Sequence, residues 1–241
     1  MLPADAFALS NVDDEHGEMM LEGIRAKIYT YGFKNPADFN EKLNTKILGN
    51  FNAYNALAVY ATAVLLGLDK AKVKEILKDT EPPRGRFEHF TSGNGVLIIV
   101  DYAHTPDALE NVLKTIQSSF PGKKIISVFG CGGDRDSLKR PIMGKIGAVN
   151  SDIAIFTSDN PRGEDPEKII EEMKGNLSAD DLKKVKTISN RRQAILEAVK
   201  LAQKGDIILC AGKGHENYQI IKGVKSHFDD MEEFKEAFQQ K

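Results

Sequence analysis

A regular alternation of short apolar runs with longer amphipathic stretches, beginning at residue 87, constrains the fold more than any other feature of this sequence. The apolar runs have the length and β-branched composition of strands, and we expect strands at 87–91, 96–100, 124–129, 153–156, 185–188, 206–210 and 218–221. Helical patterns accompany them at 106–118, 138–149, 166–173, 190–203 and 230–238. Because Gly93, Asn94 and Gly95 suit a hairpin turn, the sheet should begin with an antiparallel pair. The pattern predicts an α/β fold, a Rossmann-like and mostly parallel sheet with an antiparallel edge and helices on both faces.

The first 82 residues follow a weaker pattern. We expect strands at 7–9 and 27–31 and helices at 15–22, 49–66 and 69–78. Residues 11–14 have the side chains of an N-cap for the first of these helices, and the helix at 49–66 is apolar enough all round to be buried. Residues 81–86 then interrupt every periodicity. We therefore place a domain boundary here, with one domain over 1–82 and a second over 83–241.

Charge and cysteine content argue against several classes of function. The 33 basic and 35 acidic residues nearly cancel, so no long-range field favours nucleic acid or an anionic membrane surface. Cys131 and Cys210 are not spaced with histidines as a zinc site requires, and we expect free thiols in a reducing cytoplasm. Residues 1–10 lack the pattern of a secretory signal, and no apolar stretch has membrane-spanning length. We expect a soluble, cytoplasmic monomer that binds small molecules.

A polar loop at 157–166 follows the expected strand 153–156, at the strand end where open α/β sheets bind ligands. Pro161 has a fixed φ and biases Asn160 away from helical geometry, so the loop should present Asn160 and Arg162 in a set relation. An arginine can hold a carboxylate through two parallel hydrogen bonds, which a lysine cannot do. A strand-to-helix turn with a solvated arginine is the alternative reading of the same residues.

Two glycine-rich loops follow other strands on the same side of the sheet. The amides of 130–136 could form an anion-binding nest beside Arg135, but no Lys-Ser or Lys-Thr pair follows, so the loop is not a P-loop. In the loop 211–216, flexible glycines accompany Glu216, whose carboxylate could bind an amine. Such glycine turns are also common without any ligand.

Polar side chains that suit a nucleoside occur in two further places. Asp101, which follows the strand 96–100, has two carboxylate oxygens that can accept the hydroxyls of a ribose, although it equally suits a cap or turn. His104 in the same loop fits a packed loop histidine at least as well as a catalyst. Asn52 and Asn55 lie three apart on one face of the expected helix 49–66. They could read a nucleobase, or be an N-cap and a satisfied buried amide.

As a set, these motifs resemble the Mur ligases of peptidoglycan synthesis. The resemblance is carried by Gly-Asn-Phe-Asn-Ala-Tyr-Asn at 49–55, Gly-Arg-Phe-Glu at 85–88, Asp-Tyr-Ala-His-Thr-Pro-Asp at 101–107, Gly-Cys-Gly-Gly-Asp-Arg-Asp at 130–136, Lys-Arg-Pro at 139–141, Asp-Asn-Pro-Arg at 159–162 and Gly-Lys-Gly-His-Glu at 212–216. It implies that the residues meeting the adenosine of ATP are Asn55, Arg86, Asp101 and His104. It implies that those holding the incoming amino acid are Arg135, Asp159, Asn160, Pro161, Arg162, Gly212 and Glu216.

The Asp-Asn-Pro-Arg loop is similar to that of the family members that add meso-2,6-diaminopimelate. The non-reacting end of this amino acid carries a carboxylate, which suits Arg162 with Arg135, and an ammonium, which suits Glu216. Lysine lacks that carboxylate and would leave arginines unpaired, which disfavours it by more than a missing methylene could.

Several parts of a complete family member are not found in this sequence. They are an N-terminal domain for the UDP-sugar, a glycine-rich ATP phosphate loop, the magnesium ligands and a modified lysine; the segment 39–48 is also shorter than the family pattern. The resemblance therefore implies a fragment, in which 1–82 is the C-terminal part of the central ATP-binding domain and 83–241 is the Mur ligase C-terminal domain. We expect no catalytic residue and no metal ligand in it, and no activity by itself.

For the intact enzyme the resemblance implies ATP and Mg²⁺ as cofactors and UDP-N-acetylmuramoyl-L-alanyl-D-glutamate as the second substrate. Its D-glutamate side-chain carboxylate would be activated as an acyl phosphate, which an amine of diaminopimelate then attacks. The alternatives are a folylpolyglutamate synthase-like ligase, which is not expected to carry Asp-Asn-Pro-Arg, and a non-catalytic module that binds an amino acid and a nucleotide.

Overall fold

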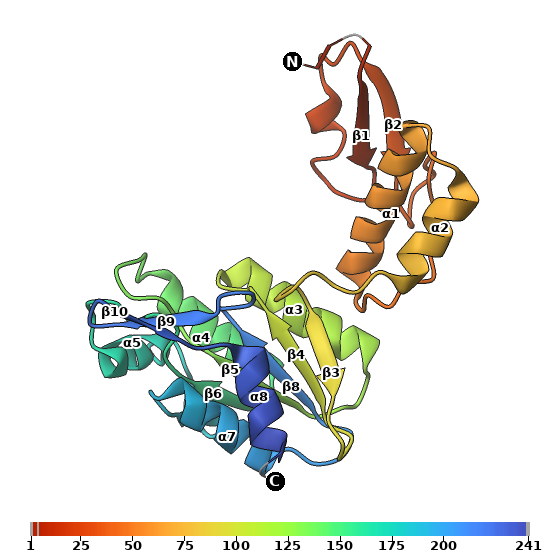
Figure 1. Cartoon of the computed structure of the whole chain (residues 1–241). Helices are drawn as coiled ribbons and strands as arrows, with labels where there is room; N and C mark the ends of the chain where they lie inside the picture. Colours follow the sequence, from red (N-terminus) through yellow and green to blue (C-terminus); the bar gives the residue numbers. More distant parts are fainter. Residues whose placement is uncertain (1, 4, 240–241) are drawn as a thin grey trace. The chain divides into compact units, whose positions relative to one another are not determined.

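The computed structural model describes residues 2–3 and 5–239 of the chain. It divides into two compact units, Met1–Pro82 and Pro83–Lys241, which we describe separately (Figure 1). The division falls at the pair of prolines where the sequence periodicity breaks. No helix in the described part of the chain is both long and apolar enough to cross a membrane.

The first unit contains a small parallel sheet and two helices. Strands β1 (Phe7–Asn11) and β2 (Lys27–Tyr31) pair in parallel, and α1 (Asn50–Leu65) and α2 (Lys70–Asp79) accompany them. The core consists of Phe39, Leu57, Tyr60, Ala61, Val73 and Leu77. Asp69 caps α2 as predicted, because its carboxylate accepts a hydrogen bond from the amide of Lys72.

Two predictions for this unit are wrong. The helix expected at 15–22 is only a 3₁₀ turn, η1 (Met19–Leu21). Asp13 does not cap it, because its carboxylate accepts hydrogen bonds from the amides of Phe33 and Lys34 instead. The helix expected to be buried on all sides is α1, in which Tyr60 is fully buried but Val59 is 56% exposed. A two-stranded sheet and one neighbouring helix cover only one side of it.

The second unit contains a six-stranded sheet of the predicted kind. Its strands are β3 (Glu88–Thr91), β4 (Leu97–Asp101), β5 (Ile125–Phe129), β6 (Ile153–Phe156), β7 (Val185–Thr187) and β8 (Ile207–Ala211). The order is β3-β4-β8-β5-β6-β7, and every pairing is parallel except that of β3 with β4. Hence β8, the last of these six strands along the chain, lies between β4 and β5.

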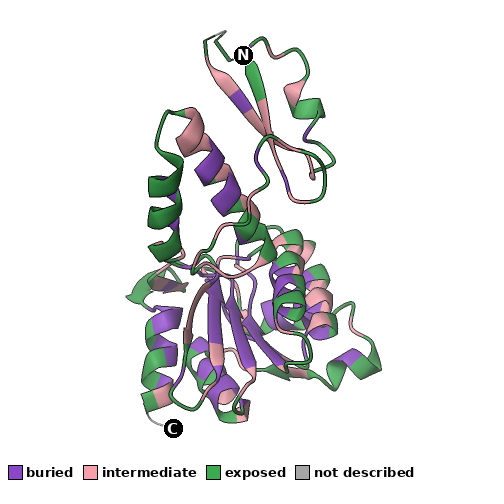
Figure 2. Cartoon of the chain, turned by 90° about the vertical axis from the view of Figure 1, so that its right-hand side faces the viewer, coloured by how far each residue is buried: buried purple, intermediate pink, exposed green. Residues whose placement is uncertain are grey.

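Helices cover both faces of this sheet (Figure 1). They are α3 (Pro106–Ser119), α4 (Lys139–Asn150), α5 (Pro166–Met173), α7 (Arg191–Leu201) and α8 (Asp230–Gln239). The apolar sides of α7 and α8 pack on the strands through Ile195 and Phe234, which are fully buried. Figure 2 shows the buried strands enclosed between the helical layers.

The sequence pattern did not reveal a short helix, α6 (Ala179–Leu182), and a strand, β10 (Val224–His227). Strand β10 is exposed along its whole length, so it lacks the alternation of apolar and polar residues that marks a strand. It pairs antiparallel with β9 (Tyr218–Ile221), outside the main sheet.

Candidate functional site

The sheet order brings four loops together at the carboxyl edge of the second unit. These loops follow β4, β8, β5 and β6, which are successive neighbours in the sheet. They contain the residues expected to bind ligands, apart from Arg86, which precedes β3, and Asn55 in the first unit. Open α/β sheets bind ligands at this edge.

The loop after β6 holds Arg162 in a constrained conformation. Its φ is 51°, a left-handed value that is uncommon outside glycine. The amide of Arg162 donates to the carbonyl of Ile220 at 3.0 Å, and its own carbonyl accepts from the amide of Lys222 at 2.7 Å. Its Nη1 donates to the carbonyl of Gly133 at 2.7 Å. The strand β9 and the loop after β5 thus fix this arginine from two sides, which argues against a freely solvated side chain.

Arg135 and Arg162 lie against the same glycine. A Cβ placed on Gly132 would be 3.0 Å from Nη1 of Arg162 and 3.6 Å from Cγ of Arg135. Arg135 is exposed, whereas Arg162 is half-buried. The guanidinium of Arg162 and the stem of Arg135 therefore lie near the same glycine.

The glycine-rich loop was predicted to form an anion-binding nest, and this prediction is wrong for two of its amides. The amide of Gly133 donates to the carbonyl of Asn160 at 2.9 Å, and the amide of Asp134 donates to the Glu164 carboxylate at 2.5 Å. A Cβ on Gly133 would lie 1.9 Å from the carbonyl oxygen of Pro161, so the loops after β5 and β6 are in backbone contact. These amides join the two loops and are not available to an anion.

Arg140 holds the same two loops in place, a role that the sequence did not reveal. Its side chain is 1% exposed, and its two Nη atoms donate to the Glu164 carboxylate, each at 2.8 Å. It also donates to the Glu172 carboxylate at 2.6 Å and the Gly132 carbonyl at 3.2 Å. The hydrogen bonds from Arg140, together with the Asp134 amide, lower the pKa of Glu164 to about 2. The signals in the sequence were its position at the start of a helix and the Lys-Arg-Pro motif at 139–141, neither of which indicates what Arg140 contacts.

Asn160, Lys213 and Glu216 form a buried polar cluster beside Arg162. Asn160 Nδ2 donates to Glu216 Oε2 at 2.8 Å, and its Oδ1 accepts from the Ile220 amide at 2.9 Å. Lys213 is fully buried, and its Nζ lies 3.3 Å from Glu216 Oε2 and 3.4 Å from Asn160 Oδ1. Asn160 therefore positions Glu216 and does not offer its whole amide to a ligand. Lys213 was not among the predicted site residues, because a lysine between glycines reads as exposed.

Asp159 lies against Gly212. A Cβ on Gly212, which has a φ of 111°, would be 2.6 Å from Oδ2 of Asp159. Burial raises the pKa of the Asp159 carboxyl, while the nearby charges of Arg191 and Lys213 lower it. The expected site residues Asp159 and Gly212 are therefore direct neighbours, and only a glycine permits their approach.

A buried ion pair supports this part of the edge. Arg191 begins α7 and Asp230 begins α8, and both side chains are fully buried. Nε and Nη2 of Arg191 donate to the two carboxylate oxygens of Asp230, each at 2.7 Å, and Nη2 also donates to the carbonyl of Ala211 at 3.1 Å. The pair ties the ends of both helices to the end of β8.

At the other end of the edge, aromatic and cationic groups surround Tyr102. The guanidinium of Arg86 lies 4.8 Å from the centre of its ring, and the rings of His104 and His215 lie at 4.5 and 5.0 Å. The structure thus places Arg86 and His104 together, while His215 is a neighbour that the sequence did not single out. Such exposed planar groups suit the stacking of an aromatic base.

Asp101 is anchored within the same region. Its Oδ2 accepts from the amide of Phe87 at 2.8 Å, and its Oδ1 accepts from the amide of Ala103 at 2.9 Å. Burial raises the pKa of its carboxyl, and these hydrogen bonds act in the opposite direction. The turn role and the ribose role are compatible, because a carboxylate oxygen can accept more than one hydrogen bond.

In the first unit, Asn52 and Asn55 have different environments. Asn52 is buried and its Nδ2 donates to the carbonyl of Leu48 at 2.8 Å. It is therefore a satisfied buried amide, the alternative to a role in reading a nucleobase. Gly49, not an asparagine, occupies the N-cap of α1. Asn55 is exposed, and its Nδ2 donates to Asn52 Oδ1 at 3.3 Å.

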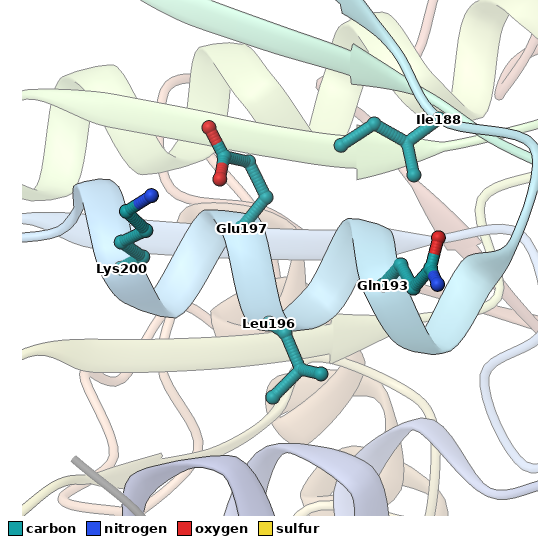
Figure 3. A pocket seen from close by; sticks show the side chains of 5 residues that line it. All are labelled: Ile188, Gln193, Leu196, Glu197 and Lys200. Carbon is teal, nitrogen blue, oxygen red and sulfur yellow. The ribbon is translucent and has the colours of Figure 1, made fainter.

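Other candidate centres in the described residues carry little chemistry. No group of three His, Cys, Asp or Glu side chains there could hold a metal ion. Cys131 and Cys210 are buried free thiols, and burial raises the pKa of Cys131 to about 12. A hollow on α7 is lined by Ile188, Gln193, Leu196, Glu197 and Lys200 (Figure 3). Glu197 already pairs with Lys186, and no expected site residue lies there.

Comparison with known proteins gives a consistent result. The family model described as "Mur ligase, glutamate ligase domain" matches residues 85–214. A UDP-N-acetylmuramoyl-L-alanyl-D-glutamate--2,6-diaminopimelate ligase of Bacteroides thetaiotaomicron is 49% identical and covers 98% of this chain, which spans 53% of that protein. A protein of the same name from Cytophaga hutchinsonii is 51% identical, with 95% of this chain and 51% of that protein covered. The chain spans about half the length of these curated relatives.

Solved structures show the same likeness. A structure titled as a UDP-N-acetylmuramoyl-L-alanyl-D-glutamate--2,6-diaminopimelate ligase matches with a TM-score of 0.68 at 35% identity, covering 97% of this chain and 53% of that one. A folylpolyglutamate synthase of Thermotoga maritima matches with a TM-score of 0.55 at 19% identity, covering 81% of this chain and 47% of that one. At that identity the second likeness concerns the fold alone.

Proposed function

The chain belongs to the Mur ligase family, and we propose that it provides the amino-acid-binding end of an ATP-dependent ligase that adds meso-2,6-diaminopimelate to UDP-N-acetylmuramoyl-L-alanyl-D-glutamate. The relatives of the same printed name support this substrate, and so does the geometry of the carboxyl edge. The second unit carries the proposed amino-acid site, and we propose that the first is the C-terminal part of a central ATP-binding domain.

One observation carries the proposal: groups of opposite charge lie side by side on adjacent loops. Arg162 and Arg135 lie against Gly132, and Glu216 is hydrogen-bonded to Asn160, two residues before Arg162. This pairing fits a ligand end that bears a carboxylate and an ammonium on one carbon, as diaminopimelate does at its distal centre. Lysine has only the ammonium there, so it would leave the arginines without their partner.

The residues of this chain would act by binding and orientation. Held at its distal end, diaminopimelate presents its other amine from a fixed position, which raises the effective concentration of the nucleophile. Arg140 and the Arg191–Asp230 pair contribute by keeping the loops in place. None of these groups needs to transfer a proton or a phosphoryl group in this role.

The nucleoside of ATP would lie against Arg86, Tyr102 and His104, with Asp101 beside them. The fit rests on the exposed planar groups around Tyr102 and on the lone pairs left to Asp101. ATP would supply the phosphoryl group that activates the acceptor carboxylate. No group of metal-ligating side chains is found among the described residues, so none of them is assigned to Mg²⁺.

Calorimetric titration of the purified chain with meso-diaminopimelate and with L-lysine tests the proposal. We expect diaminopimelate to bind at least about tenfold more tightly, because a charge-assisted bidentate contact is worth about 1.5–3 kcal/mol. Equal affinities, or no heat with either amino acid at millimolar concentration, would contradict it.

A further inference from the structure

The β9–β10 hairpin lies outside the main sheet, yet its first strand is hydrogen-bonded to the loop that carries Arg162 (Figure 1). The amide of Arg162 donates to the carbonyl of Ile220 at 3.0 Å, and the carbonyl of Arg162 accepts from the amide of Lys222 at 2.7 Å. These two bonds place Arg162 opposite Ile221 as an isolated parallel bridge. The hairpin therefore acts on Arg162 as a neighbouring strand, although the two segments are far apart in the sequence.

Two further hydrogen bonds join β9 to the residues before Arg162. The amide of Ile220 donates to Asn160 Oδ1 at 2.9 Å, and Gln219 Nε2 donates to the carbonyl of Asp159 at 2.7 Å. Asn160 and Gln219 are both buried, so these bonds are shielded from competing water. The loop is thus attached to β9 at residues 159, 160 and 162.

The tip of the hairpin has the same uncommon backbone conformation as Arg162. Strand β9 ends at Ile221 and β10 begins opposite it at Val224, so Lys222 and Gly223 form a two-residue turn. Their φ values are 49° and 78°, the positive pair that a type I′ turn requires. The amide that donates to the Arg162 carbonyl belongs to this lysine. The conformation of the turn therefore sets the position of the donor.

The guanidinium of Arg162 depends on the backbone that the hairpin holds. A φ of 51° is unfavourable for arginine itself, so it persists only while neighbouring groups fix it. From this backbone, Nη1 reaches the carbonyl of Gly133 at 2.7 Å. If the amide of Lys222 moved away, the Arg162 carbonyl would lose this partner and the residue could relax to a negative φ. The side chain would then start from a different direction.

We propose that the β9–β10 hairpin is a specificity-determining element and that Lys222 is a positioning residue, whose left-handed turn holds Arg162 in the conformation that binds the distal carboxylate of the amino acid. Selectivity for diaminopimelate over lysine then depends on the turn as well as on the arginine. The inference rests on the proposed function for the identity of the ligand. The attachment of Arg162 to the hairpin, in contrast, is a property of the free chain and can be measured without any ligand.

Variants of Lys222 separate the conformation of the turn from the charge of the lysine. Lys222→Val places a β-branched residue where φ is positive, which strains the turn, whereas Lys222→Asn creates the favoured Asn-Gly pair. Both variants remove the same positive charge. Lys225→Val is the matched control, because it makes the same substitution at an exposed position within β10, where valine suits a strand.

Hydrogen exchange of the Arg162 amide, followed by NMR in the free chain, gives the first readout. Lys222→Val should raise the exchange rate about tenfold, because a strained turn opens the bond to the Ile220 carbonyl more often. In Lys222→Asn and Lys225→Val the amide should exchange no faster than in wild type.

Calorimetry with meso-diaminopimelate and with L-lysine gives the second readout. Lys222→Val should raise the Kd of diaminopimelate about tenfold, because the competent conformation of Arg162 becomes less populated. The Kd of lysine should change little, since lysine has no distal carboxylate. Lys222→Asn should keep the wild-type selectivity, although it lacks the same charge.

The two readouts separate the possible failures. An Arg162 amide that exchanges equally slowly in wild type and Lys222→Val would overturn the inference, because the turn would not hold the arginine. Faster exchange with an unchanged Kd for diaminopimelate would also overturn it, as would an equal loss of affinity in Lys222→Asn. If the wild-type chain binds neither amino acid, the proposed function fails, while the exchange rates still decide whether the hairpin holds Arg162.

Discussion

Arg162 combines an unusual backbone conformation with hydrogen bonds from two neighbouring segments. A φ of 51° costs a non-glycine residue free energy, so the surrounding contacts must hold it there. The bonds to Ile220, Lys222 and Gly133 do so. Strain of this kind is concentrated at ligand sites, which agrees with a role in binding.

Arg162→Ala should raise the Kd of meso-diaminopimelate about tenfold to a hundredfold, because a charge-assisted bidentate contact of about 1.5–3 kcal/mol is lost. Binding of L-lysine should change little, since lysine has no distal carboxylate to lose a partner. Calorimetry with both amino acids measures this. An equal loss for both ligands would mean that the arginine serves only the structure of the loop.

At this scale the sequence singled out candidate residues by their chemical type and did not single out those whose role depends on burial. A carboxylate-binding loop can be inferred from Pro161 and Arg162, because proline fixes φ and arginine suits a carboxylate. Lys213 and Arg140 were missed because a buried cation cannot be recognised before its partners are known. Those partners come from strands and helices far along the chain.

At the scale of elements, the loops after β5 and β6 touch through Gly133 and the carbonyl of Pro161. Gly133→Ala would place a Cβ 1.9 Å from that oxygen, so the two loops would have to separate. We expect a loss of unfolding free energy of about 1–3 kcal/mol, together with weaker binding of diaminopimelate. Urea unfolding and calorimetry measure the two effects.

Gly93→Ala is the matched control, because a Cβ there would meet nothing within 4 Å. Its stability should stay within about 0.5 kcal/mol of wild type. Comparable losses in both variants would show that the close approach of the two loops is not what requires Gly133.

The Arg140–Glu164 contact between α4 and the start of α5 should appear as a dependence of stability on pH. The pKa of Glu164 is lowered from 4.5 to about 2, so its ionised form stabilises the fold above pH 4.5. That contribution is lost as pH falls toward 2. Urea unfolding at several pH values should therefore show the largest difference in unfolding free energy between wild type and Glu164→Gln above pH 5. The difference should become progressively smaller below pH 4. A difference that does not vary with pH would count against an ionised, paired Glu164.

Strands and helices were largely predictable, and their order in the sheet was not. The six strands of the main sheet lie where the apolar runs are, and in the four central strands, β4, β8, β5 and β6, burial on both faces produces that pattern. The position of β8 between β4 and β5 depends on packing between distant segments, which leaves no local signal. The failed helix at 15–22 has a similar cause, because Asp13 binds amides twenty residues away instead of those next to it.

At the scale of the whole molecule, the 241 residues contain no Gly-Lys-Ser or Gly-Lys-Thr phosphate loop. We predict that the purified chain neither hydrolyses ATP nor forms the amide at a useful rate, because the loop with which P-loop enzymes hold the ATP phosphates and position the metal is not among these residues. Release of inorganic phosphate over time measures this. Steady release that disappears in Asp101→Ala would refute the prediction and place a phosphoryl-transfer site within these residues.

A crystal structure of the chain with meso-diaminopimelate tests the central claim most directly, since the claim concerns where each end of the ligand lies. We expect the distal carboxylate to lie within hydrogen-bonding distance of the Arg162 guanidinium and the distal ammonium to lie beside Glu216 Oε1. The other amine should point away from the sheet edge. A ligand bound elsewhere, or bound here with its carboxylate turned away from Arg162, would contradict it.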